Sequence, residues 1–302
     1  MNNKPLISVI MNCYNGGKYL EESINSLVNQ TYQNWELIFW DNLSTDNSYE
    51  IFNKFNDKRL KYFRSTKHVI LYQARNLALQ KTNGDFIAFL DTDDIWLPNK
   101  LEKQVPLFNN PKIGLVYGNF WNYNEKKFFS KKKIVRKNIL KRGKITQHLI
   151  KNYYIGILTV IIRKEFINNL KEVFNTKYNL LADFDFILKF SLKHEFDFIE
   201  EPVAIYRQHE KQLQYLEIEK QADQLCAWYE KTQSSKIFGS DNQLSWVKNK
   251  CEFLKIIKDI KQKKFSKSFS NILKYPNNIN KIKLILIFLL QEKIITRLIS
   301  FT

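Results

Sequence analysis

Residues 86–94 read Phe86-Ile87-Ala88-Phe89-Leu90-Asp91-Thr92-Asp93-Asp94. An apolar run followed directly by three carboxylates predicts a buried strand with the acidic side chains just beyond its end. Neighbouring carboxylates repel one another unless a cation or hydrogen-bond donors offset their charge. Hard cations such as Mg²⁺ and Mn²⁺ prefer oxygen ligands and commonly share them with substrate phosphates. The stretch therefore predicts a metal and diphosphate site, and the simpler alternative is an acidic surface turn.

On either side of this stretch, the first 120 residues alternate between two periodicities. Strand-like apolar runs occur at Leu6–Met11, Glu36–Trp40, Leu60–Phe63, Phe86–Leu90 and Gly114–Tyr117. Helical spacing occurs at Lys18–Asn29, Asn47–Asn56, Leu71–Lys81 and Asn99–Asn109. Strands that alternate with helices predict an α/β fold with a mostly parallel sheet covered on both faces. Because ligands bind at the carboxyl ends of such strands, the loops after Met11, Trp40 and Leu90 are the expected site.

Two of these loops are polar and short. In Asp41-Asn42-Leu43-Ser44-Thr45-Asp46, Asp41 or Asn42 could accept a hydrogen bond from a base or a ribose. The alternative is a helix cap formed by Ser44, Thr45 or Asp46, and both can hold at once. The loop 12–17 has a glycine turn, and the helix start that follows can face a phosphate.

The rest of the chain is less regular. Residues 125–144 are rich in Lys and Arg and predict a basic, solvated loop, with an acceptor-side flap or a lipid contact as the alternative. Ile157–Arg163 predicts a strand and Asp183–Lys193 a helix, whereas only helical patterns follow residue 212. The apolar stretch Ile279–Phe301 is flanked by lysines. It predicts either a helix lying in a membrane interface or a helix packed on the main domain.

Charge and cysteine content limit the class of protein. The formal charge of +18 suits nucleotide phosphates, nucleic acid or an anionic membrane, although a Lys-rich codon bias also explains part of it. No nucleic-acid-binding module is recognisable, so no nucleic acid partner is expected. Cys13, Cys226 and Cys251 match no metal or disulfide spacing and are expected to be reduced thiols. With neither a signal peptide nor a spanning segment predicted, a cytoplasmic protein is expected, with the membrane's cytoplasmic face as an alternative setting.

Five ordered blocks resemble the family 2 glycosyltransferases, which have a GT-A fold. The blocks are Ser8–Asn15, Ser26–Tyr32, Asp41–Asp46, Ala74–Asn76 and Gly84–Asp94. Their order and spacing agree over residues 5 to 120 and more weakly to 210. The resemblance implies a nucleotide-sugar half at residues 1–120 and an acceptor half at 121–211, with a helical region at 212–302.

The resemblance also implies transfer from a nucleotide sugar, usually a UDP-sugar, with inversion at the anomeric carbon. Asp91 would face the ribose, and Asp93 would hold Mn²⁺ or Mg²⁺ on the diphosphate. The implied donor-binding residues are Asn12, Tyr14, Asn15, Asp41, Asn42, Arg75, Asp91, Thr92, Asp93 and Arg207. Arg75 could instead brace its helix against the acidic loop. Asn42 and Leu43 stand where the family usually has Asp-Gly, which leaves the identity of the base open.

Further along, Ala182-Asp183-Phe184-Asp185 resembles the family's Glu-Asp-x-Asp element. It implies that Asp183 is the general base, with Ala182 in place of the usual Glu. Arg207 and His209 belong to a later element that resembles one closing the site, which implies a phosphate partner and a further metal ligand.

The resemblance therefore implies an inverting glycosyltransferase that transfers sugar to a saccharide or lipid-linked acceptor in the synthesis of bacterial surface polysaccharide. Two alternatives remain from the sequence. One is an inactive scaffold with the same fold, and the other is a basic protein that binds a membrane surface or nucleic acid.

Overall fold

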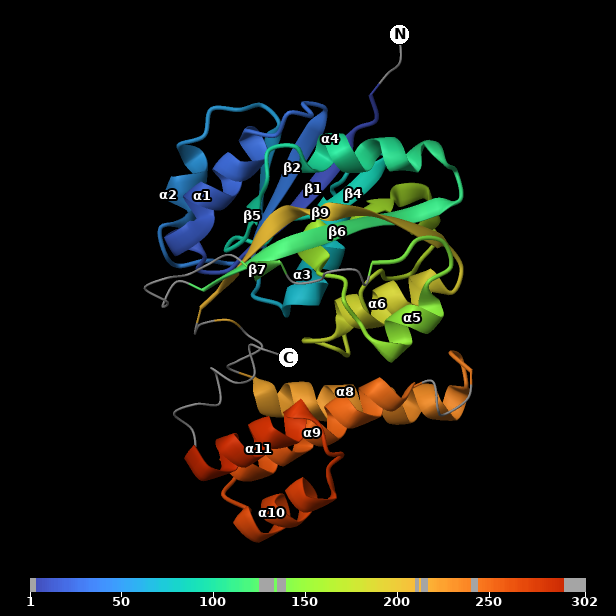
Figure 1. The fold of residues 1–302 in the computed structure, drawn as a ribbon. Helices are drawn as coiled ribbons and strands as arrows, with labels where there is room; N and C mark the ends of the chain where they lie inside the picture. The colour runs from blue at the N-terminus through green and yellow to red at the C-terminus, as the bar shows by residue number, and fades with distance from the viewer. Residues whose placement is uncertain are drawn as a thin grey trace. The chain divides into compact units, whose positions relative to one another are not determined.

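The computed structural model describes residues 4–124, 133–134, 140–209, 212, 217–239 and 244–290 (Figure 1). The chain divides into two compact units. The first comprises Met1–Thr146 and Tyr154–Arg207, and the second comprises Gln147–Tyr153 and Gln208–Thr302. Most of the predicted basic loop, 125–144, and the end of the apolar stretch, beyond residue 290, lie outside the described residues.

Four parallel strands form the first half of the sheet. They are β1 (Ile7–Cys13), β2 (Trp35–Asp41), β3 (Leu60–Arg64) and β4 (Phe86–Phe89), in the order β3-β2-β1-β4. All residues of β1, β2 and β4 are buried. Burial on both faces explains why these strands read as continuous apolar runs rather than as an alternating pattern.

Antiparallel strands extend the sheet beyond β4. They are β8 (Ile161–Arg163), β6 (Ile113–Asn124), β9 (Glu195–Gln208) and β5 (Ile95–Trp96), with β7 (Lys133–Ile134) paired to β6. The prediction of an α/β sheet flanked by helices, with a helical C-terminal region, is confirmed. Strand β9 was not predicted from the sequence, because its buried and exposed residues follow no clear alternation.

Helices and short 3₁₀ turns connect the strands of the first unit. They are α1 (Gly17–Val28), α2 (Ser48–Asn53), α3 (Leu71–Leu79), α4 (Lys100–Gln104) and α6 (Ala182–Ser191), while α5 (Thr146–Lys151) spans the division between the units. The helix expected over Asn99–Asn109 becomes a 3₁₀ turn from Val105 onward, because Pro106 has no N–H to continue the α-helical bonding. The strand expected at Ile157–Arg163 begins only at Ile161, after a 3₁₀ turn.

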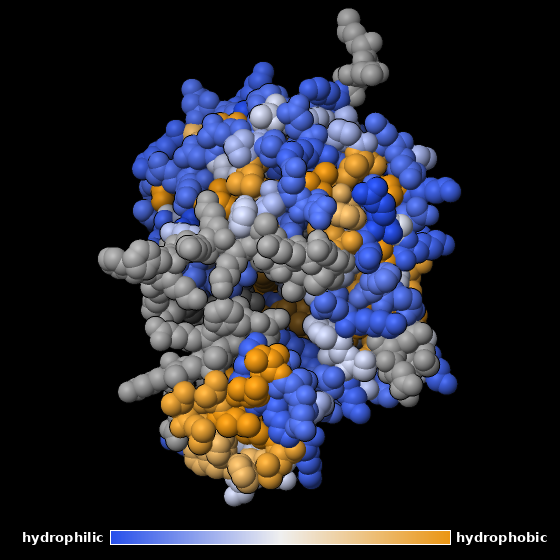
Figure 2. Space-filling model, in the orientation of Figure 1, coloured by the Kyte–Doolittle hydropathy of each residue, from blue (hydrophilic) through white to orange (hydrophobic). Residues whose placement is uncertain are grey.

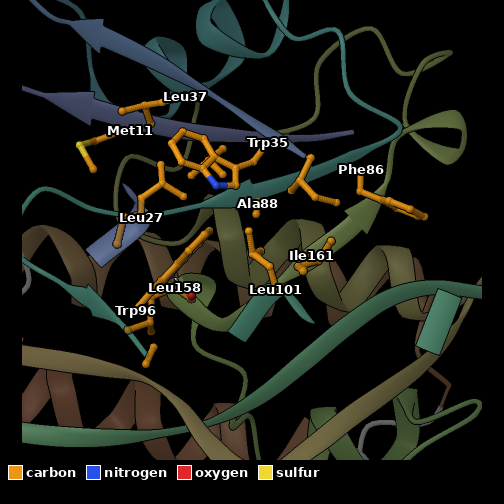
Figure 3. Close-up of a cluster of buried hydrophobic side chains, with 14 of the residues drawn as sticks. Met11, Leu27, Trp35, Leu37, Phe86, Ala88, Trp96, Leu101, Leu158 and Ile161 are labelled. Carbon is orange, nitrogen blue, oxygen red and sulfur yellow. Dashed lines mark hydrogen bonds between the residues drawn. The ribbon is translucent and has the colours of Figure 1, made fainter. Parts of the chain in front are cut away.

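One hydrophobic cluster holds this unit together (Figure 3). Met11, Leu37 and Ala88 come from three neighbouring parallel strands, and Leu27 of α1 lies over them. Trp96 continues the cluster toward the antiparallel part, where its indole Nε1–H donates to the Leu158 carbonyl at 2.9 Å. The core thus fixes the strands whose ends carry the polar loops.

The second unit is helical in its described part. It contains α8 (Ile218–Ser235), α9 (Ser245–Lys261), α10 (Phe265–Lys274) and α11 (Ile279–Leu290). A disulfide joins Cys226 of α8 to Cys251 of α9. The expectation of three reduced thiols is therefore wrong for this pair and holds only for Cys13, because sequence spacing does not show which residues two packed helices bring together. Within the described ranges, no helix is both long and apolar enough to cross a bilayer.

Candidate active site

Three loops of the first unit meet at one edge of the sheet. Cys13 and Asp41 pair at the ends of β1 and β2, and β4 runs beside β1 in the same direction. The loop after β4 approaches the β1 loop closely, since a Cβ on Gly16 would lie 2.9 Å from Thr92 Oγ1. The structure therefore brings together the three loops that the sequence pointed to.

Hydrogen bonds tie the first two loops to each other. The Asn15 N–H donates to Ser44 Oγ at 3.0 Å, and the Thr45 N–H donates to Asn15 Oδ1 at 2.8 Å. Asp46 accepts from the Gly17 N–H at 3.0 Å, at the first residue of α1. Asn15 thus orders the loop that leads into α1, and its contact with a donor stays a prediction.

Asp41 is buried at the end of β2. Its two carboxylate oxygens accept from the Ser44 N–H at 2.7 Å and from the Tyr62 hydroxyl at 2.6 Å. Burial, together with this carboxylate, raises the pKa of Tyr62, so the phenol keeps its proton and continues to donate. These two hydrogen bonds hold the Asp41 carboxylate in a single orientation at the start of the loop.

The side-chain amide of Asn42 binds the backbone of Val69. Its Nδ2 donates to the Val69 carbonyl at 2.7 Å, and its Oδ1 accepts from the Val69 N–H at 3.2 Å. A carboxylate at this position could not make the first of these bonds, because it has no N–H. Asn42 therefore fastens the segment before α3, and the proposed contact with a base stays a prediction.

Two residues of the β1 loop differ sharply in exposure. The Tyr14 side chain is 54% exposed, and its ring lies 4.2 Å from the His68 ring between centroids. Asn12 is buried, and neither polar atom of its amide has a hydrogen-bond partner among the described residues. A buried amide without a partner carries a desolvation cost, which a bound ligand could relieve.

The acidic loop is anchored by a buried arginine. Arg75 on α3 is 2% exposed, and its guanidinium donates to Asp91 Oδ1 at 2.6 Å. Burial alone would lower the pKa of Arg75, but the neighbouring Asp91, Tyr72 and Asp183 raise it instead. The group therefore stays charged and braces α3 against the acidic loop, which was one of the two roles considered for it.

The two remaining carboxylates of the loop differ from each other. Asp94 is buried, and its Oδ1 accepts the Arg207 N–H at 3.1 Å. Burial, reinforced by the charges of Asp93 and Asp91, raises the pKa of Asp94 well above its usual range. Asp94 is thus a structural carboxyl group, and Asp93, which is partly exposed, is the one of the two suited to a cation.

No group of three or more His, Cys, Asp or Glu residues in the described ranges could enclose a metal ion. Asp93 offers a single hard carboxylate, and Mg²⁺ or Mn²⁺ in sites that carry phosphate typically takes one or two carboxylates plus phosphate and water oxygens. The residues present therefore fit a cation shared with a diphosphate rather than a cation held by protein alone.

Arg207 holds the acidic loop from the other side. Its Nε–H donates to the Asp93 carbonyl at 3.0 Å, and its guanidinium pairs with Glu22 on α1. The Tyr19 ring lies against the same guanidinium at 4.6 Å. Arg207 thus ties β9 to α1 and to the acidic loop, and its proposed contact with phosphate stays a prediction.

Asp183 lies in the first turn of α6. Its Oδ1 accepts the Tyr72 hydroxyl at 2.7 Å and the Phe184 N–H at 2.9 Å. Tyr72 is buried, and burial, reinforced by the Asp183 charge, raises the pKa of the phenol well above its usual range. The phenol therefore keeps its proton and orients the carboxylate.

The proposed metal ligand His209 belongs to the second unit, whereas Asp93 belongs to the first. That assignment stays a prediction. Sequence reasoning also missed three residues that position the candidate groups, namely Glu22, Tyr62 and Tyr72. Tyr72 had one available signal, because it lies three residues before Arg75 and so shares a helix face with it.

Solved structures show the same fold. Staphylococcus aureus TarS residues 1–349, in a complex with UDP, superposes with a TM-score of 0.61 at 19% identity, covering 80% of this chain and 68% of that one. The mannosyltransferase PcManGT of Pyrobaculum calidifontis, in a complex with GDP-Man and Mn²⁺, gives a TM-score of 0.63 at 14% identity, covering 99% and 85%. The chain thus shares the GT-A fold of these two structures.

Sequence comparison shows the family. The family pattern described as glycosyl transferase family 2 matches residues 8–170, and the chain belongs to this family. It is 37% identical over 163 residues to WfgD of Escherichia coli, a UDP-Glc:α-D-GlcNAc-diphosphoundecaprenol β-1,3-glucosyltransferase. This match covers 54% of the chain and 62% of the relative. It is 39% identical over 106 residues to TuaG of Bacillus subtilis, a putative teichuronic acid biosynthesis glycosyltransferase, covering 34% and 42%.

Proposed function

We propose that this glycosyltransferase moves a sugar from a UDP-sugar to a saccharide or lipid-linked acceptor, with inversion, in the synthesis of a bacterial surface polysaccharide. The setting proposed is the cytoplasm, at the inner face of the membrane. The name of TuaG refers to teichuronic acid biosynthesis and that of WfgD to a lipid-linked acceptor, which supports the general role. The donor, the acceptor and the mechanism are the parts that experiment must test.

One observation carries the proposal. Helix α3 contacts both halves of the candidate site, with Arg75 bound to Asp91 and Tyr72 bound to Asp183. Residues three apart lie on the same face of a helix, so one short rigid element positions the donor-side carboxylate and the candidate base together. Such preorganisation is what a transferase needs if it is to hold two substrates in line.

The proposed reaction is a single displacement. The acceptor hydroxyl oxygen bonds to the anomeric carbon as the bond from that carbon to the diphosphate oxygen breaks. Asp183 takes the proton of the acceptor hydroxyl, and the nucleoside diphosphate leaves with the bonding electron pair. Tyr72 keeps the Asp183 carboxylate oriented during this transfer.

The donor side is assigned to the three loops. Tyr14 would stack against the base, Asp41 would accept from the base or the ribose, and Asp91 would face the ribose. Asn12 and Thr92 lie in the same loops and are proposed to contact the donor. Asp93 would hold Mg²⁺ or Mn²⁺, which offsets the negative charge on the departing diphosphate when it is bound.

The named relatives guide the choice of substrates. WfgD is named for transfer from UDP-Glc to a GlcNAc-diphosphoundecaprenol acceptor. TarS was solved with UDP and with UDP-GlcNAc, whereas PcManGT was solved with GDP-Man. UDP-glucose and a polyprenyl-diphosphate acceptor are therefore the first pair to test, with GDP-mannose included because Asn42 departs from the common pattern.

The alternatives explain less of the site. An inactive scaffold has no need for a buried tyrosine that orients Asp183, and a nucleic-acid-binding protein has no need for carboxylates at the strand ends. The scaffold remains the stronger of the two alternatives, because Ala182 stands where the family usually has Glu.

The main test measures sugar transfer and donor hydrolysis over a panel of nucleotide sugars, with Mn²⁺, Mg²⁺ or EDTA. We expect turnover of one donor that is lost in EDTA and falls by on the order of a hundredfold in Asp93→Ala. The control is Asp197→Ala, which removes a carboxylate on β9 that pairs with Arg142 instead of the acidic loop. Absence of turnover and of nucleotide binding across the panel would favour the scaffold.

A second variant tests the positioning of Asp183. Tyr72→Phe removes one hydrogen bond to the carboxylate, and we expect kcat to fall about tenfold while the donor KM changes little. Tyr32→Phe is the matched control, because its buried hydroxyl donates instead to the Pro5 carbonyl. Equal losses in the two variants would mean that Tyr72 acts only on stability.

A further inference from the structure

Helices α10 and α11 carry an exposed apolar surface in the second unit. On α10, Phe265, Phe269 and Leu273 are 40%, 52% and 60% exposed. On α11, Ile282, Ile285 and Leu289 are 54%, 41% and 68% exposed. These six residues define what we call the α10–α11 face. Figure 2 shows a broad hydrophobic area over these two helices.

The face belongs to folded helices that are already packed on their other side. Leu284 and Ile287 of α11 are fully buried, and both α10 and α11 contact α9. The Phe288 ring lies 6.1 Å from that of Phe265 and 5.9 Å from that of Phe269, which holds the two exposed rows side by side. The two sequence-based alternatives for this stretch thus combine, because one side of α11 packs within its unit while the other stays exposed.

The spacing on each helix is regular. The exposed residues of α10 are four apart, and those of α11 are three and four apart, so each row runs along one helix face. Monomeric proteins rarely expose a contiguous apolar patch of this kind unless it binds a partner or a membrane.

The charge around the face selects the partner. Residues 261–290 contain no Asp or Glu. Their lysines are Lys261, Lys263, Lys264, Lys267, Lys274, Lys281 and Lys283, of which Lys267 pairs with Asp259 of α9. A second copy docked symmetrically would bring the same lysines to the same contact, and like charges across an interface are costly. An anionic lipid surface offers opposite charge to the lysines and hydrocarbon to the apolar rows.

We propose that the α10–α11 face binds the surface of an anionic phospholipid bilayer, with its apolar rows at the headgroup boundary and its lysines against the lipid phosphates. Stable attachment of a peripheral protein usually needs two such signals, apolar burial and basic charge, and this face has both. Binding of the face to lipid does not depend on the proposed function. The proposed function only gives the binding a purpose, since a lipid-linked acceptor would be found at that surface.

Flotation of the full chain with vesicles tests the proposal without any sugar donor. We expect the chain to float with vesicles of phosphatidylcholine and phosphatidylglycerol in equal parts, much less with phosphatidylcholine alone, and less as salt rises. Phe269→Ser with Leu289→Ser should lower the partition coefficient at least about tenfold. Lys264→Gln with Lys274→Gln should lower it about fivefold for each lysine removed.

Matched controls separate the face from general surface effects. Leu170→Ser with Ile237→Ser removes two exposed apolar side chains outside α10 and α11, and Lys54→Gln with Lys112→Gln removes two exposed lysines elsewhere. Unchanged flotation of the Phe269/Leu289 variant would overturn the proposal. A marked fall in the melting temperature of this variant would also overturn it, because it would mean that the face is packed internally. A change of this variant from dimer to monomer in sedimentation would overturn it too, because the face would then be a contact between two copies of the chain.

The outcome is distinct from that of the proposed function. Vesicle binding without sugar transfer would support lipid binding by the α10–α11 face and contradict the proposed transferase activity. Sugar transfer in solution without vesicle binding would support the activity and contradict lipid binding.

Discussion

Leu43 has a φ of +71°, in the left-handed region of backbone conformation. A non-glycine residue there costs about 1–2 kcal/mol, because its Cβ crowds the following carbonyl oxygen. The common pattern of the family that this segment resembles has glycine at the position. The chain therefore keeps the backbone conformation of a glycine turn next to Asp41 while carrying a leucine, and the turn stores strain.

Leu43→Gly should release this strain. We expect the free energy of unfolding of the first unit to rise by about 1 kcal/mol, as measured by urea titration. Leu192→Gly is the matched control: Leu192 is 38% exposed and has a φ of −65° at the end of α6, so the same change should lower stability there. A loss of stability in Leu43→Gly would show that the leucine side chain makes a compensating contact.

Asn42 shows how a substitution can be read only in part from sequence. An Asn in place of the family's usual Asp suggested a changed contact with the base. In the structure, its amide binds both polar groups of the Val69 backbone, and this requires a donor and an acceptor on one side chain. Because the Asn42 amide is used in this way, Asp41 is the better candidate for base recognition.

Among the elements, β1, β2 and β3 are joined by the buried Glu36 of β2, which also binds Asn83 in the loop before β4. Its Oε1 accepts from Ser8 Oγ at 2.6 Å and from the Asn83 N–H at 2.7 Å, and its Oε2 pairs with Lys61 at 2.5 Å. Burial alone would raise the pKa of Glu36, but these hydrogen bonds outweigh it and lower the pKa from its ordinary value of 4.5. The carboxylate therefore stays charged and links three strands of the sheet.

Acid should weaken this link. A carboxyl group whose pKa is lower in the folded state adds stability above its unfolded pKa, and that stability is lost as pH falls through the folded pKa. We expect Glu36→Gln to lower the free energy of unfolding by about 2 kcal/mol at neutral pH. The difference from the native chain should shrink below about pH 4. Chemical denaturation across pH measures this, with the exposed Glu172→Gln as the control; a difference that does not change with pH would contradict the assignment.

Helix α3 is the element with the largest consequence for function. Its short sequence has a weak amphipathic pattern and no capping side chain. Its role depends on Tyr72 and Arg75 reaching partners 111 and 16 residues away in the chain. Their spacing places the two side chains on one helix face, but only the folded structure shows that they serve the two halves of the site.

In the molecule as a whole, the acidic residues of the candidate site and the lysine-rich segment lie in different units. The carboxylates of the candidate site lie in the first unit, while residues 261–290 of the second unit carry lysines without any acidic residue. The net charge of +18 therefore does not describe the site, and composition alone leaves nucleotide phosphates, nucleic acid and an anionic membrane equally open as partners. The disulfide between α8 and α9 also belongs to the second unit and was not expected for a cytoplasmic chain.

The sequence by itself determined the parallel half of the sheet and the loops that carry the site, because buried strands and amphipathic helices leave local periodicities that can be read along the chain. It also marked Asp41, Asp91, Asp93 and Asp183 through short ordered blocks. The tertiary structure alone decided that Arg75 braces Asp91, that Tyr72 holds Asp183, and that Asn42 binds the backbone. It alone showed that α11 keeps a second apolar side exposed. Hydrogen bonds and burial at these positions join residues far apart in sequence, and such partners leave no periodic signal.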